Sequence, residues 1–146
     1  MKPEVKQQWI KALRSRKYRK GNSIYLHTKQ NHSSKFSALG VLTDLYMKEK
    51  EHQWNYVLDK HYDEEDVPVY VGLSSSKQIA VDNEVRGKLS PLVMRWAGLE
   101  DSVATLPNLS NLRVDQREEI QKMGATVVAL DEMQFSKLAL IIEKAY

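Results

Sequence analysis

Apolar residues recur at helical spacing from the start of the chain. Pro3 suits the first turn of a helix, where a backbone N–H has no intrahelical partner. The apolar positions that follow share one stripe: Val5, Trp9, Ala12 and Leu13. The pattern predicts a helix over "PEVKQQWIKALRSRKY", with Tyr18 near its end and Gly21-Asn22 as the stop.

A short extended piece and a second helix are predicted next. The piece "SIYLH" favours extended backbone, and Ser33-Ser34 is a candidate N-cap for the helix that follows. The apolar stripe of this helix consists of Phe36, Leu39, Leu42, Leu45 and Tyr46. We interpret it as the spine of the core, in which Gly40 lets another helix, the one that carries Trp96, approach closely.

The middle of the chain changes to a strand pattern. "WNYVLD" and "VPVYVGL" are rich in β-branched and aromatic residues, and they flank the acidic connector "KHYDEED". The two segments predict a pair of strands joined by an exposed loop. "IAVD" is a candidate third strand.

The last third of the chain is again helical. Ser90 as N-cap, Pro91 at the first helical position and Gly98 just past the end delimit one helix. "SVATLPNLSNLRV" is predicted to cross the core irregularly, with three leucines against it: Leu106, Leu109 and Leu112. A helix is predicted from Asp115 to Glu132, where Gly124 favours a break.

The final helix, "FSKLALIIEKAY", has a wide apolar stripe: Phe135, Leu138, Ile141 and Ile142. A recognition-helix interpretation of this segment leaves mainly Lys137, Glu143 and Lys144 facing outward, too few basic groups for a DNA groove. Core packing is the better interpretation.

Together these elements predict a mainly helical α+β fold with about five helices and a small antiparallel sheet in the middle. A length of 146 residues is typical of one globular domain, here 1–146. Within it we distinguish a basic N-terminal helix and arm (1–35), a strand region with an acidic loop (54–82) and a helical C-terminal part (89–146).

Composition is ordinary for a globular protein, with 42% hydrophobic and 28% charged residues. The chain has no cysteine, which excludes disulfides and thiolate metal sites. No window approaches the roughly 18 apolar residues of a membrane span, and the N-terminus lacks the apolar core of a signal peptide. A cytoplasmic location without membrane contact is expected.

Charge is distributed unevenly along the chain. Residues 1–36 hold ten of the 22 Lys and Arg residues and only one acid, Glu4, for a charge of +9. The rest holds the other 12 basic and 18 acidic residues, for a charge of −6. Such an arm can reach nucleic acid, an acidic protein or an anionic ligand, or fold back on its own body.

Motifs of known chemistry are missing. The acidic run around His61 (Asp59, Asp63, Glu64, Glu65 and Asp66) lacks the ligand offsets and turn glycine of a metal loop. "VGLSSSK" lacks the second glycine and final hydroxyl of a phosphate loop. The four histidines form no helical i, i+4 pair. We therefore predict no catalytic residue, no metal site and no cofactor.

The basic N-terminal set is the most informative feature for function. Cationic residues on or after the first helix are interleaved with tyrosines, a composition typical of contacts to single-stranded nucleic acid. The alternative is a solvated helix face. The candidate ligand- or partner-binding residues are Arg14, Arg16, Lys17, Tyr18, Arg19, Lys20 and Tyr25, with Lys11 nearby.

Four blocks of the chain carry a family resemblance: "WIKALRS", "FSALGVLTDLY", "LSPLVMRWAGL" and "ALDEMQFSKLALIIEKAY". They resemble the blocks of a family of small uncharacterised proteins of bacteriophages, cyanophages and prophages. That family reads Phe-Cys-Cys-Leu-Gly-Val-Leu-Cys-Asp-Leu in the second block and Leu-Pro-x-x-Val-x-x-Trp-Ala-Gly-Leu in the third. Its cysteines are Ser37, Ala38 and Thr43 here, so no thiol chemistry carries over.

The resemblance implies a phage setting and no activity. With the basic arm, it predicts a non-enzymatic accessory protein that binds a host or defence component, either a host protein or a small anionic, nucleotide-type ligand. The alternatives are a nucleic-acid-binding regulator and, last, a small metal-dependent nuclease or nucleotide hydrolase. Four aromatics could seat a partner or a homodimer: Trp54, Tyr56, Tyr62 and Tyr70.

Overall fold

The computed structural model describes residues 1–21, 24–59, 69–74 and 87–146. These residues form a mainly helical α+β fold, in which six helices accompany a four-stranded antiparallel sheet, and this confirms the predicted class. In chain order the elements are α1 (Pro3–Arg14), β1 (His27–Gln30), β2 (Ser33–Phe36), α2 (Ala38–Glu49), β3 (Trp54–Asp59), β4 (Val69–Ser74), α3 (Pro91–Ala97), α4 (Val114–Met123), α5 (Val127–Leu130) and α6 (Phe135–Ala145).

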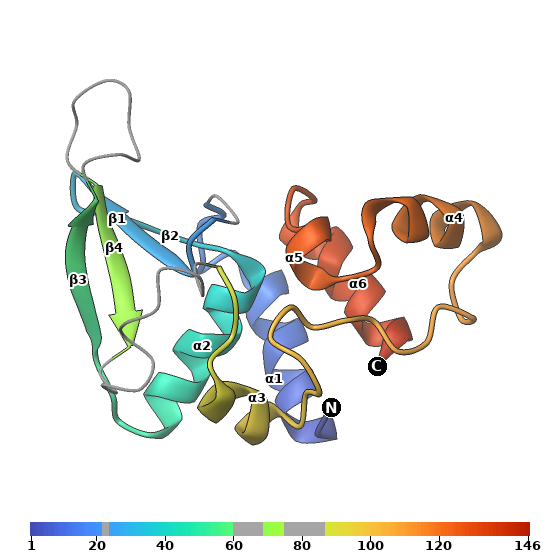
Figure 1. Cartoon of the computed structure of the whole chain (residues 1–146), viewed down its shortest axis with the longest axis horizontal. Coiled ribbons are helices and arrows are strands. Elements are labelled where there is room, and N and C mark those ends of the chain that lie inside the picture. Colours follow the sequence, from blue (N-terminus) through green and yellow to red (C-terminus); the bar gives the residue numbers. More distant parts are fainter. Residues whose placement is uncertain (22–23, 60–68, 75–86) are drawn as a thin grey trace.

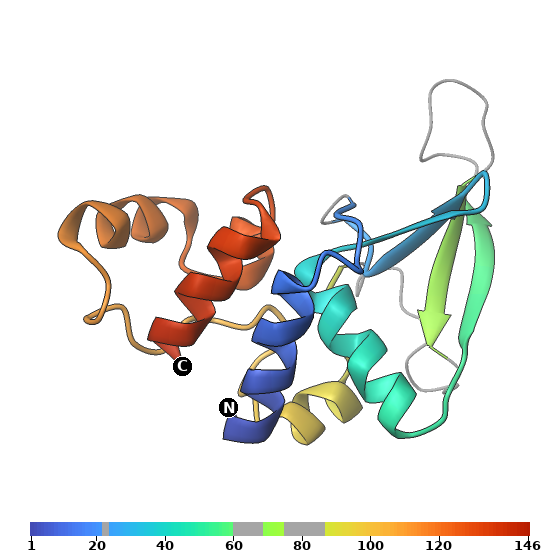
Figure 2. The same cartoon turned by 180° about the vertical axis from the view of Figure 1, so that it is seen from behind.

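Helix α1 forms as its apolar spacing predicts, but it is shorter than predicted. It buries Val5, Trp9, Ile10 and Leu13, and its axis lies between α2 and α6 (Figures 1 and 2). The helix ends at Arg14, and the backbone of Arg16 is left-handed with φ 59°, so the predicted continuation to Gly21 is wrong. The Ser15 hydroxyl donates to Ala12 O and accepts from Lys17 N–H, which turns the chain toward the sheet.

Strands β1 and β2 form a hairpin at one side of the sheet, whose order is β2-β1-β4-β3. The two-residue turn is Asn31-His32, both with positive φ (49° and 64°), as a type I′ turn requires. Ser33 and Ser34 therefore belong to β2, and the predicted N-cap there is wrong. The cap is Ser37, whose Oγ accepts from Gly40 N–H at 3.0 Å.

The predicted pairing of the two middle strands is confirmed. Strands β3 and β4 are antiparallel, with Tyr56 opposite Gly72 and Leu58 opposite Tyr70. Strand β4 also pairs with β1, where Lys29 lies opposite Tyr70. The acidic connector at 60–66 and the candidate strand "IAVD" lie outside the described residues.

Helix α2 is the spine of the core and lies against one end of the sheet (Figure 1). Gly40 permits a close approach, because a Cβ there would lie 1.7 Å from the backbone oxygen of Leu26. The neighbour is thus the segment that leads into β1. The expected approach of the helix carrying Trp96 is wrong at this position; Trp96 contacts Tyr46 instead, with ring centroids 5.6 Å apart.

The C-terminal part follows the prediction closely. Ser90 caps α3 through its Oγ, Pro91 opens the helix, and Gly98 ends it in the left-handed conformation. Gly124, with φ 106°, separates α4 from α5 at the predicted break. The crossing segment buries Leu106 and Leu112, and α6 packs along α1. One apolar cluster joins all these parts, and no helix within the described ranges has the length and apolar character that a bilayer crossing needs.

Candidate ligand-binding cleft

A cleft of about 590 Å³ opens between α1, α2 and the sheet. That volume lies in the range of small-molecule sites, about 300–1,000 Å³. Most of its lining side chains are of three kinds: lysines, aromatic rings and a buried carboxylate. The residues that carry the chemistry are Lys11, Lys17, Tyr18, His27, Phe36, Asp44, Lys48, Trp54 and Tyr56.

The sheet provides the aromatic wall, most of it from one cross-strand row together with Trp54. Phe36 lies opposite His27 in the hairpin, and the two rings stack with centroids 4.0 Å apart. Trp54 and Tyr56 meet the same His27 ring edge-on, at 4.8 and 5.4 Å. Gly72 makes this possible, because a Cβ there would lie 2.9 Å from His27 Nδ1 and 3.0 Å from Trp54 Cε3.

His27 sits at the bottom of this wall as a neutral ring. Its exposed fraction is 3%, and neither ring nitrogen has a hydrogen-bond partner within the described residues. Burial, with a smaller contribution from the charge of Lys29, lowers the pKa of His27 to about 4, against the opposing effect of Asp44. A buried polar group without a partner is uncommon and marks a place where a ligand or water can bind.

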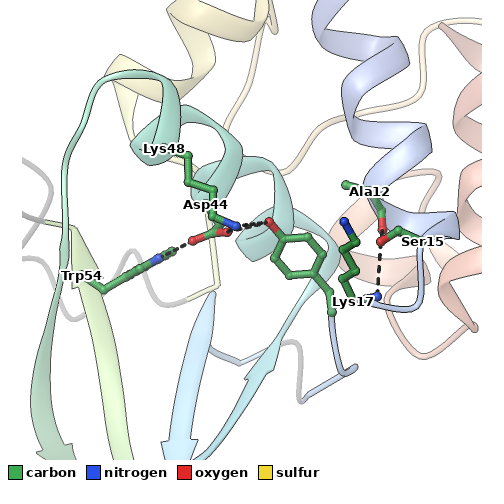
Figure 3. A network of polar contacts seen from close by, with 7 residues as sticks. Ala12, Ser15, Lys17, Asp44, Lys48 and Trp54 are labelled. Carbon is green, nitrogen blue, oxygen red and sulfur yellow. Dashed lines mark hydrogen bonds and ion pairs between the residues drawn. The ribbon is translucent and has the colours of Figure 1, made fainter.

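Asp44 organises the opposite wall (Figure 3). One carboxylate oxygen accepts from Trp54 Nε1 at 2.9 Å, and the other accepts from Tyr18 Oη at 2.6 Å and pairs with Lys48 Nζ at 2.9 Å. Burial raises the pKa of Asp44, but the three donors outweigh it and hold the pKa below its ordinary value. The carboxylate therefore stays ionised and holds three cleft residues in place.

Lysines surround the entrance. Lys48 also donates to Tyr18 Oη at 3.1 Å, and its Nζ lies 5.2 Å from the centre of the Tyr18 ring. Lys11 and Lys17 are exposed, and neither ammonium is part of an ion pair among the residues that the structure describes. With Asp44 as the only carboxylate among the described lining residues, the cleft carries a charge of +2. It is therefore electrostatically suited to an anion.

The predicted binding residues divide into two groups. Lys17 and Tyr18 line the cleft. The others do not: Arg14 pairs with Glu143 at 2.8 Å, Arg19 donates to Ser33 Oγ, Arg16 is exposed, Lys20 approaches Asp131 at 3.6 Å, and Tyr25 is buried. Much of the basic arm thus contacts the body of the protein.

Six of these cleft residues were not among the predicted ligand-binding set of the basic arm: His27, Phe36, Asp44, Lys48, Trp54 and Tyr56. Two signals were present in the sequence. The period of two in "WNYVLD" places Trp54 and Tyr56 on one face of the strand, and Asp44 interrupts the apolar run of α2. An acid within a buried helix face needs partners, which is a reason to look for a polar network.

A second buried acid lies at the N-terminal end of α2. Asp131 Oδ1 accepts from Ala38 N–H at 2.9 Å and lies 3.6 Å from Lys20 Nζ. Asp131 Oδ2 has no hydrogen-bond partner in the described part of the chain. Burial raises the pKa of Asp131 to about 6, although the Ala38 N–H and the Lys20 charge act in the opposite direction.

The polar groups of the cleft are arranged for holding a ligand. Asp44 is ionised and fully engaged by donors, so it is poorly suited to take up a proton. His27 is a weak base because its pKa is about 4. Within the described ranges, no group of three or more histidines and acids is close enough to bind a metal ion.

Comparison with known proteins places the chain in a family. It belongs to the family described as "Domain of unknown function (DUF8296)", whose model matches residues 1–146. No curated protein and no solved structure matches the chain.

Proposed function

We propose that this chain is a non-enzymatic binding protein that captures an anionic, ring-bearing ligand of the nucleotide type in its cleft. One observation carries the proposal: three lysines and a wall of aromatic rings meet in a single cavity of about 590 Å³. Ammonium groups bind phosphate through charge, and aromatic rings stack on a nucleobase. A nucleotide carries both groups and can make both contacts at once.

The positions of these groups support two separate subsites. Lys11 and Lys17, from α1 and the turn after it, are exposed, and their ammonium groups can contact a phosphate. Trp54 and Tyr56, from β3, present ring surface on the sheet side of the cavity. Asp44 fixes Tyr18, Lys48 and Trp54 before a ligand arrives, so little ordering is needed on binding.

The same geometry favours binding over catalysis. General acid–base catalysis is most efficient when the pKa of the catalytic group lies near the working pH. The pKa of Asp44 is below its ordinary value and that of His27 is about 4. These two are the cleft groups most suited to proton transfer, and both are mismatched at neutral pH.

In the bacteriophage setting that the family resemblance implies, capture of such a ligand would sequester a nucleotide-type signal. The protein would in this way act on a host or defence component. The basic N-terminal segment contributes Lys11, Lys17 and Tyr18 to this surface. A host protein with an acidic or phosphorylated segment is the competing partner class.

Calorimetric titration with adenosine and guanosine mono- and triphosphates tests the proposal. The variant Lys11→Glu/Lys17→Glu reverses two charges at the entrance, and we expect its affinity to fall at least about tenfold. Lys122→Glu/Lys137→Glu is the matched control, because both lysines are exposed, on α4 and α6, and line no part of the cleft.

Two results decide the matter. Equal weakening by both double variants would reduce the effect to overall charge and contradict a site in the cleft. Absence of heat with every nucleotide, together with capture of a host protein that the entrance variant abolishes, would favour the protein partner instead.

A further inference from the structure

The sheet face that forms the cleft wall continues beyond the cleft. Because side chains alternate along a strand, Leu58 shares a face with Trp54 and Tyr56, and Tyr70 shares it with Gly72. These strands extend past the end of α2 (Figures 1 and 2). As a result Tyr56, Leu58 and Tyr70 are 40%, 39% and 46% exposed.

Strand register orders this exposed surface. Tyr70 lies directly opposite Leu58 on one side and Lys29 on the other, so the three form one cross-strand row. The neighbouring row on the same face is Phe36, His27, Gly72 and Tyr56, which forms the cleft wall together with Trp54. Lys29 Nζ lies 5.3 Å from the centre of the Tyr56 ring and links the two rows. The cleft and the open face are therefore one continuous surface.

We infer that this surface, called here the tyrosine platform (Lys29, Tyr56, Leu58 and Tyr70), holds a second nucleotide of the ligand. The inference rests on the proposed function and narrows its ligand class: the ligand is a phosphodiester-linked oligonucleotide, with one base in the cleft and the next on the platform. Tyr56, which also lines the cleft, and Tyr70 are diagonal neighbours, about 7–8 Å apart in such a register. Tyr56 can therefore stack the base in the cleft, and Tyr70 can stack the next base of an extended strand.

Charge complementarity supports this occupant over an apolar protein segment. The exposed surface alternates tyrosine rings with an ammonium group and contains one aliphatic residue, Leu58. No carboxylate belongs to this face among the described strand residues that line or adjoin the cleft. Lys29 extends the series of Lys11, Lys17 and Lys48 onto the sheet, so basic groups accompany the aromatic surface over its whole length. That combination is typical of single-strand binding.

Titration with adenylate chains of one, two and four nucleotides at about 50 mM salt tests the platform. We expect the affinity to rise from one nucleotide to two and to weaken as salt increases. Tyr70→Ala should lower the affinity for the tetranucleotide about five- to 150-fold and leave the mononucleotide affinity unchanged. Tyr70→Phe keeps the ring and should keep the affinity. Leu140→Ala on α6 is the control, because that apolar residue has a similar exposed fraction (39%, against 46% for Tyr70).

The outcomes separate the two levels of the proposal. A mononucleotide that binds as tightly as the tetranucleotide, with no effect of Tyr70→Ala, overturns the platform and leaves the cleft proposal intact. Failure of all nucleotides to bind overturns both. A strand of about 20 nucleotides distinguishes the source of the ligand. An affinity per site equal to that of the tetranucleotide indicates single-stranded RNA or DNA as the natural ligand, and a weaker affinity indicates a short free oligonucleotide.

Discussion

Two buried aspartates are associated with helix α2, and the net shift of the carboxyl pKa has opposite sign in the two. Asp44 lies in the middle of α2 at the cleft, and Asp131 accepts from the first N–H of that helix. Burial is the largest influence on both and raises the pKa of each. The net pKa nevertheless falls for Asp44 and rises to about 6 for Asp131.

The difference lies in the donors. Asp44 accepts from two aromatic side-chain donors and an ammonium group, all within 2.9 Å. Asp131 has one backbone N–H at 2.9 Å and an ammonium group at 3.6 Å, and its second oxygen has no partner among the described residues. Burial alone therefore does not determine the charge of a carboxylate; the number of donors on it does. The fully partnered acid is the one at the cleft.

The largest effect is expected from Asp44→Ala, which removes the acceptor from three donors at once. Because the side chains of Tyr18, Lys48 and Trp54 all lose this partner, we expect the free energy of unfolding to fall by about 3–5 kcal/mol in urea titrations at pH 7. Asp115→Ala on α4 is the control, since that side chain is 75% exposed and its loss should change stability by less than about 0.5 kcal/mol. Similar losses in both variants would contradict the network.

Asp131→Asn tests the other side of the comparison through pH. The folded pKa of about 6 lies above the ordinary value of 3.8, so the unfolded state loses this proton first as pH rises. The wild type should therefore lose up to about 3 kcal/mol through this group between pH 4 and pH 7. An asparagine side chain cannot titrate, so the stability of the variant relative to wild type should increase over that interval. A constant difference would show that the pKa of Asp131 is not shifted.

His27→Phe extends the comparison to a titratable imidazole that interacts electrostatically with Asp44. The folded pKa of about 4 lies below the ordinary 6.5, so the unfolded state binds a proton first as pH falls. The wild type should lose up to about 3 kcal/mol through His27 between pH 7 and pH 4, a slope opposite to that of Asp131.

Phenylalanine keeps an aromatic ring in the same aromatic surroundings and removes two unpartnered nitrogens, so at pH 7 the variant should be about as stable as wild type. Denaturation at pH 7, 5.5 and 4 measures the effect, and parallel pH profiles of the two proteins would contradict it.

The smallest effect is expected from removing one donor at each acid. Tyr18→Phe removes one of three donors to Asp44, and we expect a loss of about 1–2 kcal/mol. Lys20→Met keeps most of the aliphatic side chain and removes the ammonium group that lies 3.6 Å from Asp131. Below pH 6, where Asp131 is protonated, the free energy of unfolding should fall by less than about 1 kcal/mol. An equal loss in the two variants at pH 5 would remove the distinction between the acids.

The helices were predictable because packing and local spacing agree in them. In α3, the cap, the proline and the left-handed glycine all lie at the predicted positions. The end of α1 was not predictable from periodicity, because its stop depends on Ser15 hydrogen bonds and the left-handed Arg16. Helix ends are determined by a few local contacts that no apolar pattern records.

The β1–β2 hairpin and the cleft were missed for a different reason. The strands "HTKQ" and "SSKF" lack the apolar alternation of a typical strand, and their turn is Asn-His where Asn-Gly is the usual signal. The cleft gathers residues from α1, the turn after it, α2 and three strands. Chemistry assembled from distant segments leaves only single-residue traces in the sequence, such as the acid within α2.

The hydrogen bond from Trp54 to Asp44 has a practical consequence. The Trp54 indole forms part of the cleft wall and is half-buried, whereas Trp9 is fully buried and donates to Ala38 O on the core side of α2. A ligand that covers Trp54 changes the polarity and solvent contact of one indole and leaves Trp9 as it was. The protein thus carries its own fluorescent reporter of cleft occupancy, together with an internal reference in the core.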